Sequence, residues 1–374
     1  MNYEIVHAGF DGLDLSYRTL LPSGVLERFK SAKAEAIASN SSVALCISDQ
    51  EFTISGSGAS GGYQYTVDTG PLGAIWFFKD GVRSDPWGCR VSIKSLPLAL
   101  FGAAEMKQRC DEFLHRLGCQ PSITACRISR VDYAFDIIIP GFELNPDLIV
   151  CHSKSTKTDY REMETNQSGE TITGVRVGKM PGIQLGIYDK RRDAIAKKKF
   201  YWWDIWSQNA GYKIETDTVI WRFEVRAGRK AIESYFNNNT WEMIGNALGN
   251  LLANVCSRIR MVSPGSDTNR SRWPDHSIWS DIRNYLRNLP MDGSCTLEPA
   301  EILEQLEQER RDQLFSQLLG LEMSAAASMG HTEKTYDAFL AYLAMVRSQR
   351  INRFREDFSE KLASKRAVWN ARFS

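Results

Sequence analysis

The sequence has no pair of cysteines at C-x-x-C spacing and no H-x-H pair, although it contains eight cysteines and five histidines. These absences argue against a cysteine-built zinc site and against a histidine-built nuclease site. It has no apolar run of the roughly 18 to 20 residues that a membrane span needs, and no secretory leader. The formal net charge is only +1, so any nucleic-acid site has to be a local basic patch. We expect a cytoplasmic protein with reduced thiols and no membrane contact.

The first 100 residues are rich in predicted strands, and further strands are predicted up to residue 226. The β-branched or aromatic runs that predict them are 43–47, 63–67, 74–78, 123–139, 175–177, 183–188 and 219–226. Residues 56–62 are glycine and serine rich but have no Walker lysine, so we expect a hairpin connection there and no phosphate-binding loop. Helical spacing of apolar residues appears at 103–117 and along 230–262. The pattern predicts an α+β fold.

The best linker in the chain is the stretch 263–269, which contains Pro264 and Gly265. We therefore predict two domains, 1–262 and 263–374. The second is almost entirely helix-forming, at 275–289 and at 299–373. These helices either pack on one another as a bundle or mediate dimerisation, DNA binding or contact with a partner. The sequence favours none of these alternatives.

Two predicted strands carry isolated acids. Alternate residues of a strand share a face, so Asp132 and Asp136 point away from the core-facing Val131, Tyr133 and Phe135. The two aspartates lie about 13 Å apart on an ideal strand, which ranks Asp132 above Asp136 as a metal ligand. Glu224 stands between two arginines on the strand 219–226. These acids either form cross-strand ion pairs or bind Mg²⁺ or Mn²⁺, which prefer oxygen ligands.

Tyr188 ends the apolar strand 183–188 and is followed directly by Asp189 and three cations. Positive charge favours a phenolate and holds a phosphodiester, so the position suits a tyrosine nucleophile, although tyrosines at strand ends are more often structural. Between 176 and 199 eight cations face two acids, which is a local excess of six positive charges. The cluster is typical of a surface that binds the phosphates of a nucleic-acid backbone, and also of a solvated helix face. The residues assigned to DNA binding are Arg176, Lys179, Arg192, Lys197, Lys198 and Lys199.

The aromatic run 200–203, followed by Trp206, comes directly after this basic cluster. Aromatic rings interleaved with cations suit stacking on unpaired bases. Tryptophans at this density also build cores, so both interpretations stay open.

Three motifs occur in a fixed order: Arg130-x-Asp132-x-x-x-Asp136, then 186–190 around Tyr188, then 222–224. With the opening 9–13 (GFDGL), they resemble the replication initiation factor family of rolling-circle plasmids, filamentous phages and integrative elements. The resemblance covers roughly residues 1–262. It implies an antiparallel-sheet, nickase-like catalytic domain, with the nucleophile at Tyr188 and metal-binding acids at Asp132, Asp136 and Glu224. The sequence departs from the family's usual glycine-serine-arginine pattern at 177–180.

The resemblance implies an enzyme of a bacterial host cell that nicks origin DNA, single-stranded or in a hairpin. Tyr188 would form a 5′-phosphotyrosyl link and release a free 3′-hydroxyl primer, with Mg²⁺ or Mn²⁺ polarising the phosphate. Lys190 or Arg191 would stabilise the developing charge. A host helicase, a polymerase and a second copy of the chain are further candidate partners. Two alternatives stay open: a metal-dependent hydrolytic nuclease and a non-catalytic DNA-binding protein.

Overall fold

Strand β1, Glu4–Tyr17, is the central strand of a large antiparallel sheet, because it pairs with β6 on one side and with β7 on the other. The computed structural model describes residues 2–81, 86–119, 126–151, 163–169, 171–237, 239–292 and 295–373. Within these residues the sheet has 11 strands in the order β2-β3-β4-β5-β6-β1-β7-β12-β11-β10-β9. The fold is α+β, as predicted.

The other strands of this sheet are β2 Val43–Ile47, β3 Gln50–Ile54, β4 Tyr63–Asp68, β5 Ala74–Lys79, β6 Cys89–Lys94, β7 Cys126–Ile138, β9 Met163–Ser168, β10 Thr171–Gly178, β11 Ile183–Asp189 and β12 Trp221–Gly228. A separate two-stranded sheet joins β8, Ile149–Cys151, to β13, Ile259–Met261. The stretch 56–62 connects the paired strands β3 and β4, which confirms the predicted hairpin connection.

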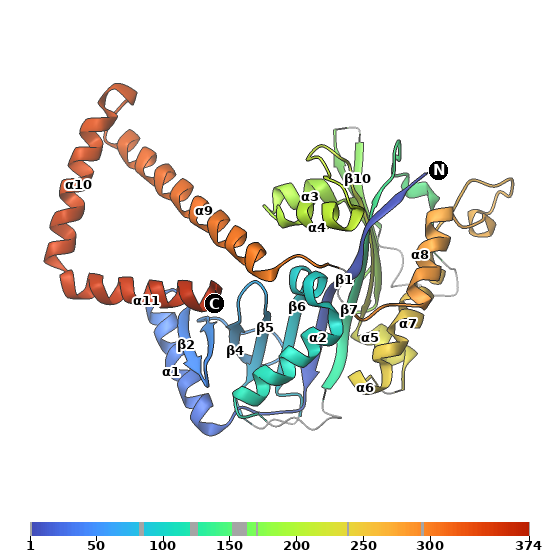
Figure 1. Ribbon diagram of the computed structural model, residues 1–374, viewed down its shortest axis with the longest axis horizontal. Helices are drawn as coiled ribbons and strands as arrows, with labels where there is room; N and C mark the ends of the chain where they lie inside the picture. The colour runs from blue at the N-terminus through green and yellow to red at the C-terminus, as the bar shows by residue number, and fades with distance from the viewer. Residues whose placement is uncertain are drawn as a thin grey trace.

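Helices cover both faces of the sheet (Figure 1). One face packs against α1 Ser23–Ser39, α2 Ser95–Arg116, α7 Leu248–Arg258 and α8 Ser277–Arg287, in a core that includes Phe29, Leu252 and Trp279. Two short helices, α5 Arg229–Tyr235 and α6 Trp241–Ile244, follow β12 and precede α7 along the chain. The opposite face is covered at one end by α3 Lys190–Ala196 and α4 Tyr201–Ala210.

The single helix predicted over 230–262 is wrong. Three short helices and strand β13 occupy that stretch, because the chain turns at Phe236, which has extended backbone angles, and again at Ile259. The apolar stripe is divided among these elements: Leu248, Leu251 and Val255 are buried in α7, while Ile244 is buried in α6 and Ile259 in β13. Helix α8 follows the predicted linker yet packs beside α7 in the same core, and the Trp279 indole donates to the Cys256 carbonyl at 2.9 Å. The division at residue 262 stays a prediction.

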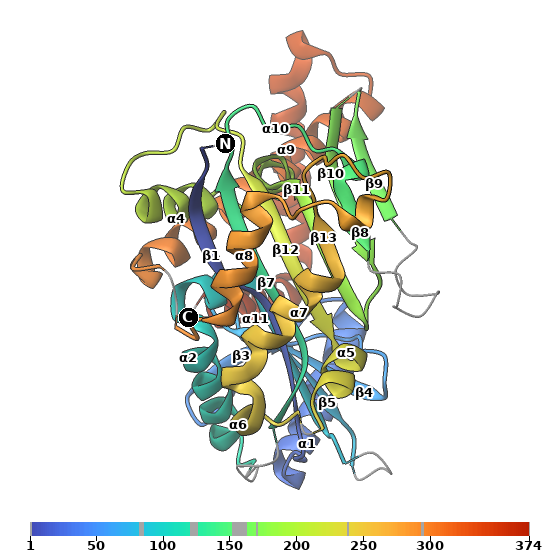
Figure 2. The same cartoon turned by 90° about the vertical axis from the view of Figure 1, so that its right-hand side faces the viewer.

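The last three helices, α9 Pro299–Ser328, α10 Tyr336–Arg353 and α11 Arg355–Phe373, form three sides of an open triangle beside the sheet (Figures 1 and 2). The helical prediction for 299–373 is confirmed, but these helices do not form a bundle packed along its length. Helix α11 returns to β2 and β3, and its Trp369 donates to Glu307 of α9 at 2.7 Å. Apolar side chains such as Phe315 and Leu321 stay exposed on α9. None of the described helices is both long enough and apolar enough to span a membrane.

Candidate active site

The candidate site lies on one face of three neighbouring strands. In register across β7, β12 and β11, Asp136 stands opposite Arg222, and Arg222 stands opposite Tyr188. Asp132 stands opposite Arg226 in the same way. Since register partners share a face of the sheet, the pairing brings the predicted tyrosine and the predicted acids onto one surface. The alternation predicted for β7 is therefore confirmed.

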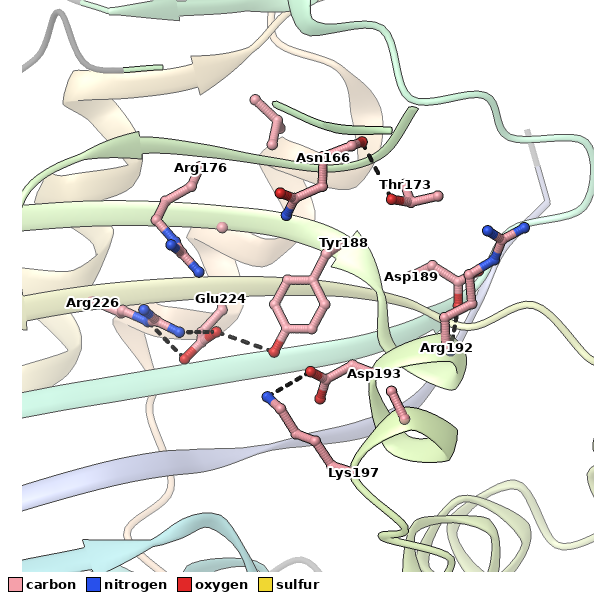
Figure 3. A pocket seen from close by; sticks show the side chains of 13 residues that line it. Asn166, Thr173, Arg176, Tyr188, Asp189, Arg192, Asp193, Lys197, Glu224 and Arg226 are labelled. Carbon is pink, nitrogen blue, oxygen red and sulfur yellow. Dashed lines mark hydrogen bonds and ion pairs between the residues drawn. The ribbon is translucent and has the colours of Figure 1, made fainter. Parts of the chain in front are cut away.

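Tyr188 stands in a cavity of about 330 Å³, shown in Figure 3. Its phenol donates a hydrogen bond to Oε2 of Glu224 at 3.3 Å. Burial holds the pKa of Tyr188 well above its ordinary value, and the negative charge of Glu224 raises it further. The tyrosine is thus a neutral phenol whose proton already points at a carboxylate. Gly174 on the neighbouring strand leaves room for it, because a Cβ there would lie 2.9 Å from the Cβ of Tyr188.

Glu224 is fully buried and has two kinds of partner. Arg226 donates to both of its carboxylate oxygens, at 2.8 and 2.6 Å. Asp11, a residue of β1, is its second neighbour, and the negative charge of Asp11 acts on Glu224. Burial raises the pKa of Glu224, the charge of Asp11 raises it further, and Arg226 opposes both. A carboxylate with a raised pKa beside a phenol is suited to accept the phenol's proton.

Asp136 forms a fully buried ion pair with Arg222. Arg222, which is fully buried, donates to both oxygens of Asp136 at 2.5 and 2.6 Å. The Trp206 indole donates to the same carboxylate at 2.8 Å. Arg222 also forms an ion pair with Asp11 and lies 4.4 Å over the ring of Trp202. Burial acts to raise the pKa of Asp136, but Arg222 holds it below its ordinary value.

Asp132 is also buried and is held by Arg130, which donates to both of its oxygens at 2.5 to 3.0 Å. Arg226 approaches it to 3.8 Å. The pKa of Asp132 is nevertheless raised, because burial outweighs the attraction of the two arginines. Ion pairs are therefore present at all three acids: across strands for Asp136 and Asp132, and within β12 for Glu224.

The three acids predicted to bind a metal do not form one ligand set in this arrangement. Within the described ranges, no group of three or more His, Cys, Asp or Glu side chains is arranged to hold a metal ion. The charge of Asp11 also acts on Glu224, and Asp11 is ion-paired with Arg222. Mg²⁺ is commonly bound by one or two carboxylates together with the phosphates of a substrate. The half-buried Asp11, close to the candidate site, fits that smaller ligand set.

Of the two cations predicted to assist catalysis, Lys190 lies closer to the tyrosine. Its ammonium group is buried, 5.9 Å from the centre of the Tyr188 ring and 5.0 Å from that of Trp202, and it bonds Asp193 at 3.2 Å. Burial, followed by repulsion from Arg222, lowers the pKa of Lys190 to about 8. Arg191 is half-buried and does not line the cavity.

The predicted DNA-binding residues divide into two groups. Arg176, Arg192 and Lys197 line the Tyr188 cavity. Lys179 lines a different cavity, with Lys230 and Arg258 near it. Lys198 and Lys199 are outside the lining, although Lys199 is close enough to Asp11 to interact with its charge. The basic cluster is thus only partly gathered at the tyrosine.

The aromatic run after this cluster is a core element. Trp202 and Trp206 are fully buried, Tyr201 and Trp203 are nearly so, and only Phe200 is exposed. Trp202 and Trp206 stack on each other with centroids 5.8 Å apart and cover the Arg222 ion pair. Of the two interpretations of this run, base stacking is therefore wrong for the four buried rings.

Two site residues were not assigned a role from the sequence, the half-buried Asp11 and the buried His7. Asp11 falls inside the quoted opening motif at 9–13, which was the available signal. His7 stands opposite Asp136 in the β1–β7 register, with its ring 5.1 Å from Trp202. Burial lowers the pKa of His7 to about 4, against the attraction of Asp136.

The buried His7 predicts a loss of stability in mild acid. The imidazole of His7 takes up a proton near pH 6.5 in the unfolded chain and only near pH 4 in the folded chain. The stability associated with the neutral, buried imidazole is therefore complete above pH 6.5 and is lost as pH falls to 4. At 1.36 kcal/mol per unit the loss is on the order of 3 kcal/mol. In urea unfolding, the free energy of unfolding of the wild type should fall by that extra amount between pH 7 and pH 4. His7→Gln should lack this loss. The exposed control His115→Gln should keep the wild-type profile, and a parallel profile for His7→Gln would contradict the assignment.

Neither the family models nor the curated proteins contain a match to this sequence. Among solved structures, a rolling circle replication initiator protein from Geobacillus stearothermophilus is similar, with a TM-score of 0.42 and 16% sequence identity. The match covers 78% of this chain and 98% of that one. A likeness of this degree does not settle what the chain does, so the function has to be argued from the site.

Proposed function

We propose that the protein is a DNA strand transferase that nicks origin DNA with Tyr188 and thereby initiates rolling-circle replication. The observation that carries the proposal is the hydrogen bond from the Tyr188 phenol to the buried Glu224 carboxylate, in a cavity lined by Arg176, Arg192 and Lys197. A nucleophile, a base beside it and cations for an anionic substrate are the parts that phosphodiester transesterification needs.

In the proposed reaction Tyr188 Oη attacks the phosphorus while its proton passes to Glu224. The bond from phosphorus to the 3′-oxygen breaks, and the 3′-oxygen takes up a proton from water. The products are a 5′-phosphotyrosyl enzyme and a free 3′-hydroxyl that a polymerase extends. Because the phosphodiester bond is exchanged rather than hydrolysed, the strand can be resealed later without ATP.

The charged neighbours have separate tasks. Arg176, Arg192 and Lys197 hold the phosphate from the open side of the cavity. Arg226 fixes both oxygens of Glu224, and the buried Lys190 keeps positive charge close to the ring as negative charge develops on the phosphate. Mg²⁺ or Mn²⁺, held by Asp11 with the substrate phosphate, would add charge that polarises the phosphate.

The test is to incubate the protein with labelled single-stranded DNA from the neighbourhood of its own gene, with Mn²⁺ or with EDTA, and to look for an SDS-resistant adduct. A cation-dependent adduct is the expected result. Cleavage without an adduct would identify a hydrolytic nuclease instead. Binding with neither cleavage nor adduct would identify a non-catalytic DNA-binding protein.

The same assay tests the role of Glu224. Glu224→Gln keeps the shape of the side chain but cannot accept the phenol's proton, and loss of a general base typically costs a factor of about 10² to 10⁴. We expect the rate of adduct formation to fall by that factor at pH 7, with part of the loss recovered at higher pH as phenolate forms. Exposed Glu105→Gln on α2 serves as the control. A wild-type rate in Glu224→Gln would remove it from the mechanism.

A further inference from the structure

A second cavity, of about 520 Å³, opens on the same face of the sheet as Tyr188 but nearer the other end of the strands. Its lining includes four arginines and one acid, namely Arg90, Arg127, Arg130, Arg229 and Asp14. Ser16 of β1 stands opposite Arg90 of β6 and also opposite Arg127 of β7. With strands roughly 4.8 Å apart, the Cα atoms of these two arginines are about 10 Å apart in one row.

Aromatic rings alternate with these arginines. The guanidinium of Arg90 lies 4.3 Å from the centre of the Phe77 ring and 5.6 Å from that of Tyr63. The guanidinium of Arg127 lies 4.0 Å from the centre of the Trp87 ring. The Nε atom of Arg90 is buried without a hydrogen-bond partner among the described residues. Cations packed on half-exposed aromatic rings are typical of surfaces that bind unpaired nucleic acid.

The row is connected to the candidate active site through β7. Arg130 lines the second cavity and also forms the ion pair with Asp132 of the candidate active site. Arg127 and Asp136 are nine residues apart on this strand, which corresponds to roughly 30 Å. A strand of DNA attached at Tyr188 and running along β7 therefore reaches the row within a few nucleotides.

We propose that the cavity at Arg90 and Arg127 binds the flank of the nicked strand, as single-stranded DNA. The arginines contact its phosphates, and the edges of the Tyr63 and Trp87 rings contact its bases, because the faces of both rings already carry cations. Contact between these rings and bases requires unpaired bases, which selects a single strand over a duplex. This inference rests on the proposed function and gives the strand a path. It also places the base contacts away from the buried run at 200–206.

The test is a binding titration on Tyr188→Phe protein in EDTA, so that neither the chemistry nor a cation is involved. The probe is a labelled 20-nucleotide single strand. We expect Arg90→Gln with Arg127→Gln to raise the Kd at least tenfold. Each phosphate contact to a single strand contributes about 0.7 to the slope of log K against log salt, so losing two should lower that slope by about 1.4. Arg116→Gln with Arg287→Gln, on helices of the opposite face, is the charge-matched control.

Wild-type affinity and salt slope in the folded double variant would overturn the inference. A second readout needs no arginine variant: strands carrying 5-iodouracil should photocrosslink to the peptides that contain Tyr63 or Trp87, and crosslinks found only elsewhere would contradict it. The two proposals fail separately. A Tyr188 adduct with unchanged binding refutes only the path, whereas weakened binding without any adduct refutes only the nickase.

Discussion

Tyr188→Phe is expected to form no SDS-resistant adduct with DNA, a loss of at least about a thousandfold, as is typical when a covalent nucleophile is removed. The variant loses only the hydroxyl that donates to Glu224 at 3.3 Å, so it should fold and should bind single-stranded DNA as the wild type does. Adduct yield and binding are measured on the same preparation, which separates chemistry from recognition.

The matched control for this substitution is Tyr212→Phe. Tyr212 is half-exposed, donates to Glu4 near the end of β1 and does not line the Tyr188 cavity. It should keep the full yield of adduct. Adduct formation that persists in Tyr188→Phe would assign the nucleophile to another residue.

Arg222→Met is expected to lower the free energy of unfolding by about 3 to 5 kcal/mol, because it leaves buried charges without their partner. The arginine is fully buried and donates to both oxygens of Asp136 and to Asp11. Methionine fills much of the same space, so most of the loss arises from the unpaired carboxylates rather than from a cavity. Urea unfolding at pH 7 measures the effect.

Two further variants define the origin of this loss. Arg272→Gln breaks an exposed ion pair with Asp267 and should cost less than about 1 kcal/mol. Adding Asp136→Leu to Arg222→Met removes one of the unpaired charges and should recover part of the stability. A change below about 1 kcal/mol in Arg222→Met would contradict the central position given to this ion pair.

Local pattern was sufficient for the part of the fold that carries the tyrosine. The apolar run before Tyr188 predicted β11, and the alternation around Asp132 predicted the polar face of β7. Both patterns are local, because the period of a strand is visible within a few residues. The position of β1 at the centre of the sheet was not predicted. Its pairing with β6 and β7 joins segments that are far apart in the sequence, and such contacts leave no local pattern.

The details of the site depended on burial and pairing, which the sequence did not reveal. Asp136 and Asp132 look alike in the sequence, but only Asp136 is closed off by Arg222 and Trp206. Asp11, which is ion-paired with Arg222, lies where a register shift in β1, between Phe10 and Gly12, interrupts the pairing with β7. The aromatic run at 200–206 was ambiguous, since a buried helix and a stacking surface use the same residues.

The central claim is that the Tyr188 oxygen becomes joined to DNA. The most direct measurement is to form the adduct with the wild-type protein, digest it with nuclease and protease, and locate the remaining nucleotide by mass spectrometry. We predict a single modified peptide that contains Tyr188, with the phosphate on the phenol oxygen. A nucleotide attached to any other residue, or DNA cleaved to a free 5′-phosphate with no modified peptide, would contradict the account.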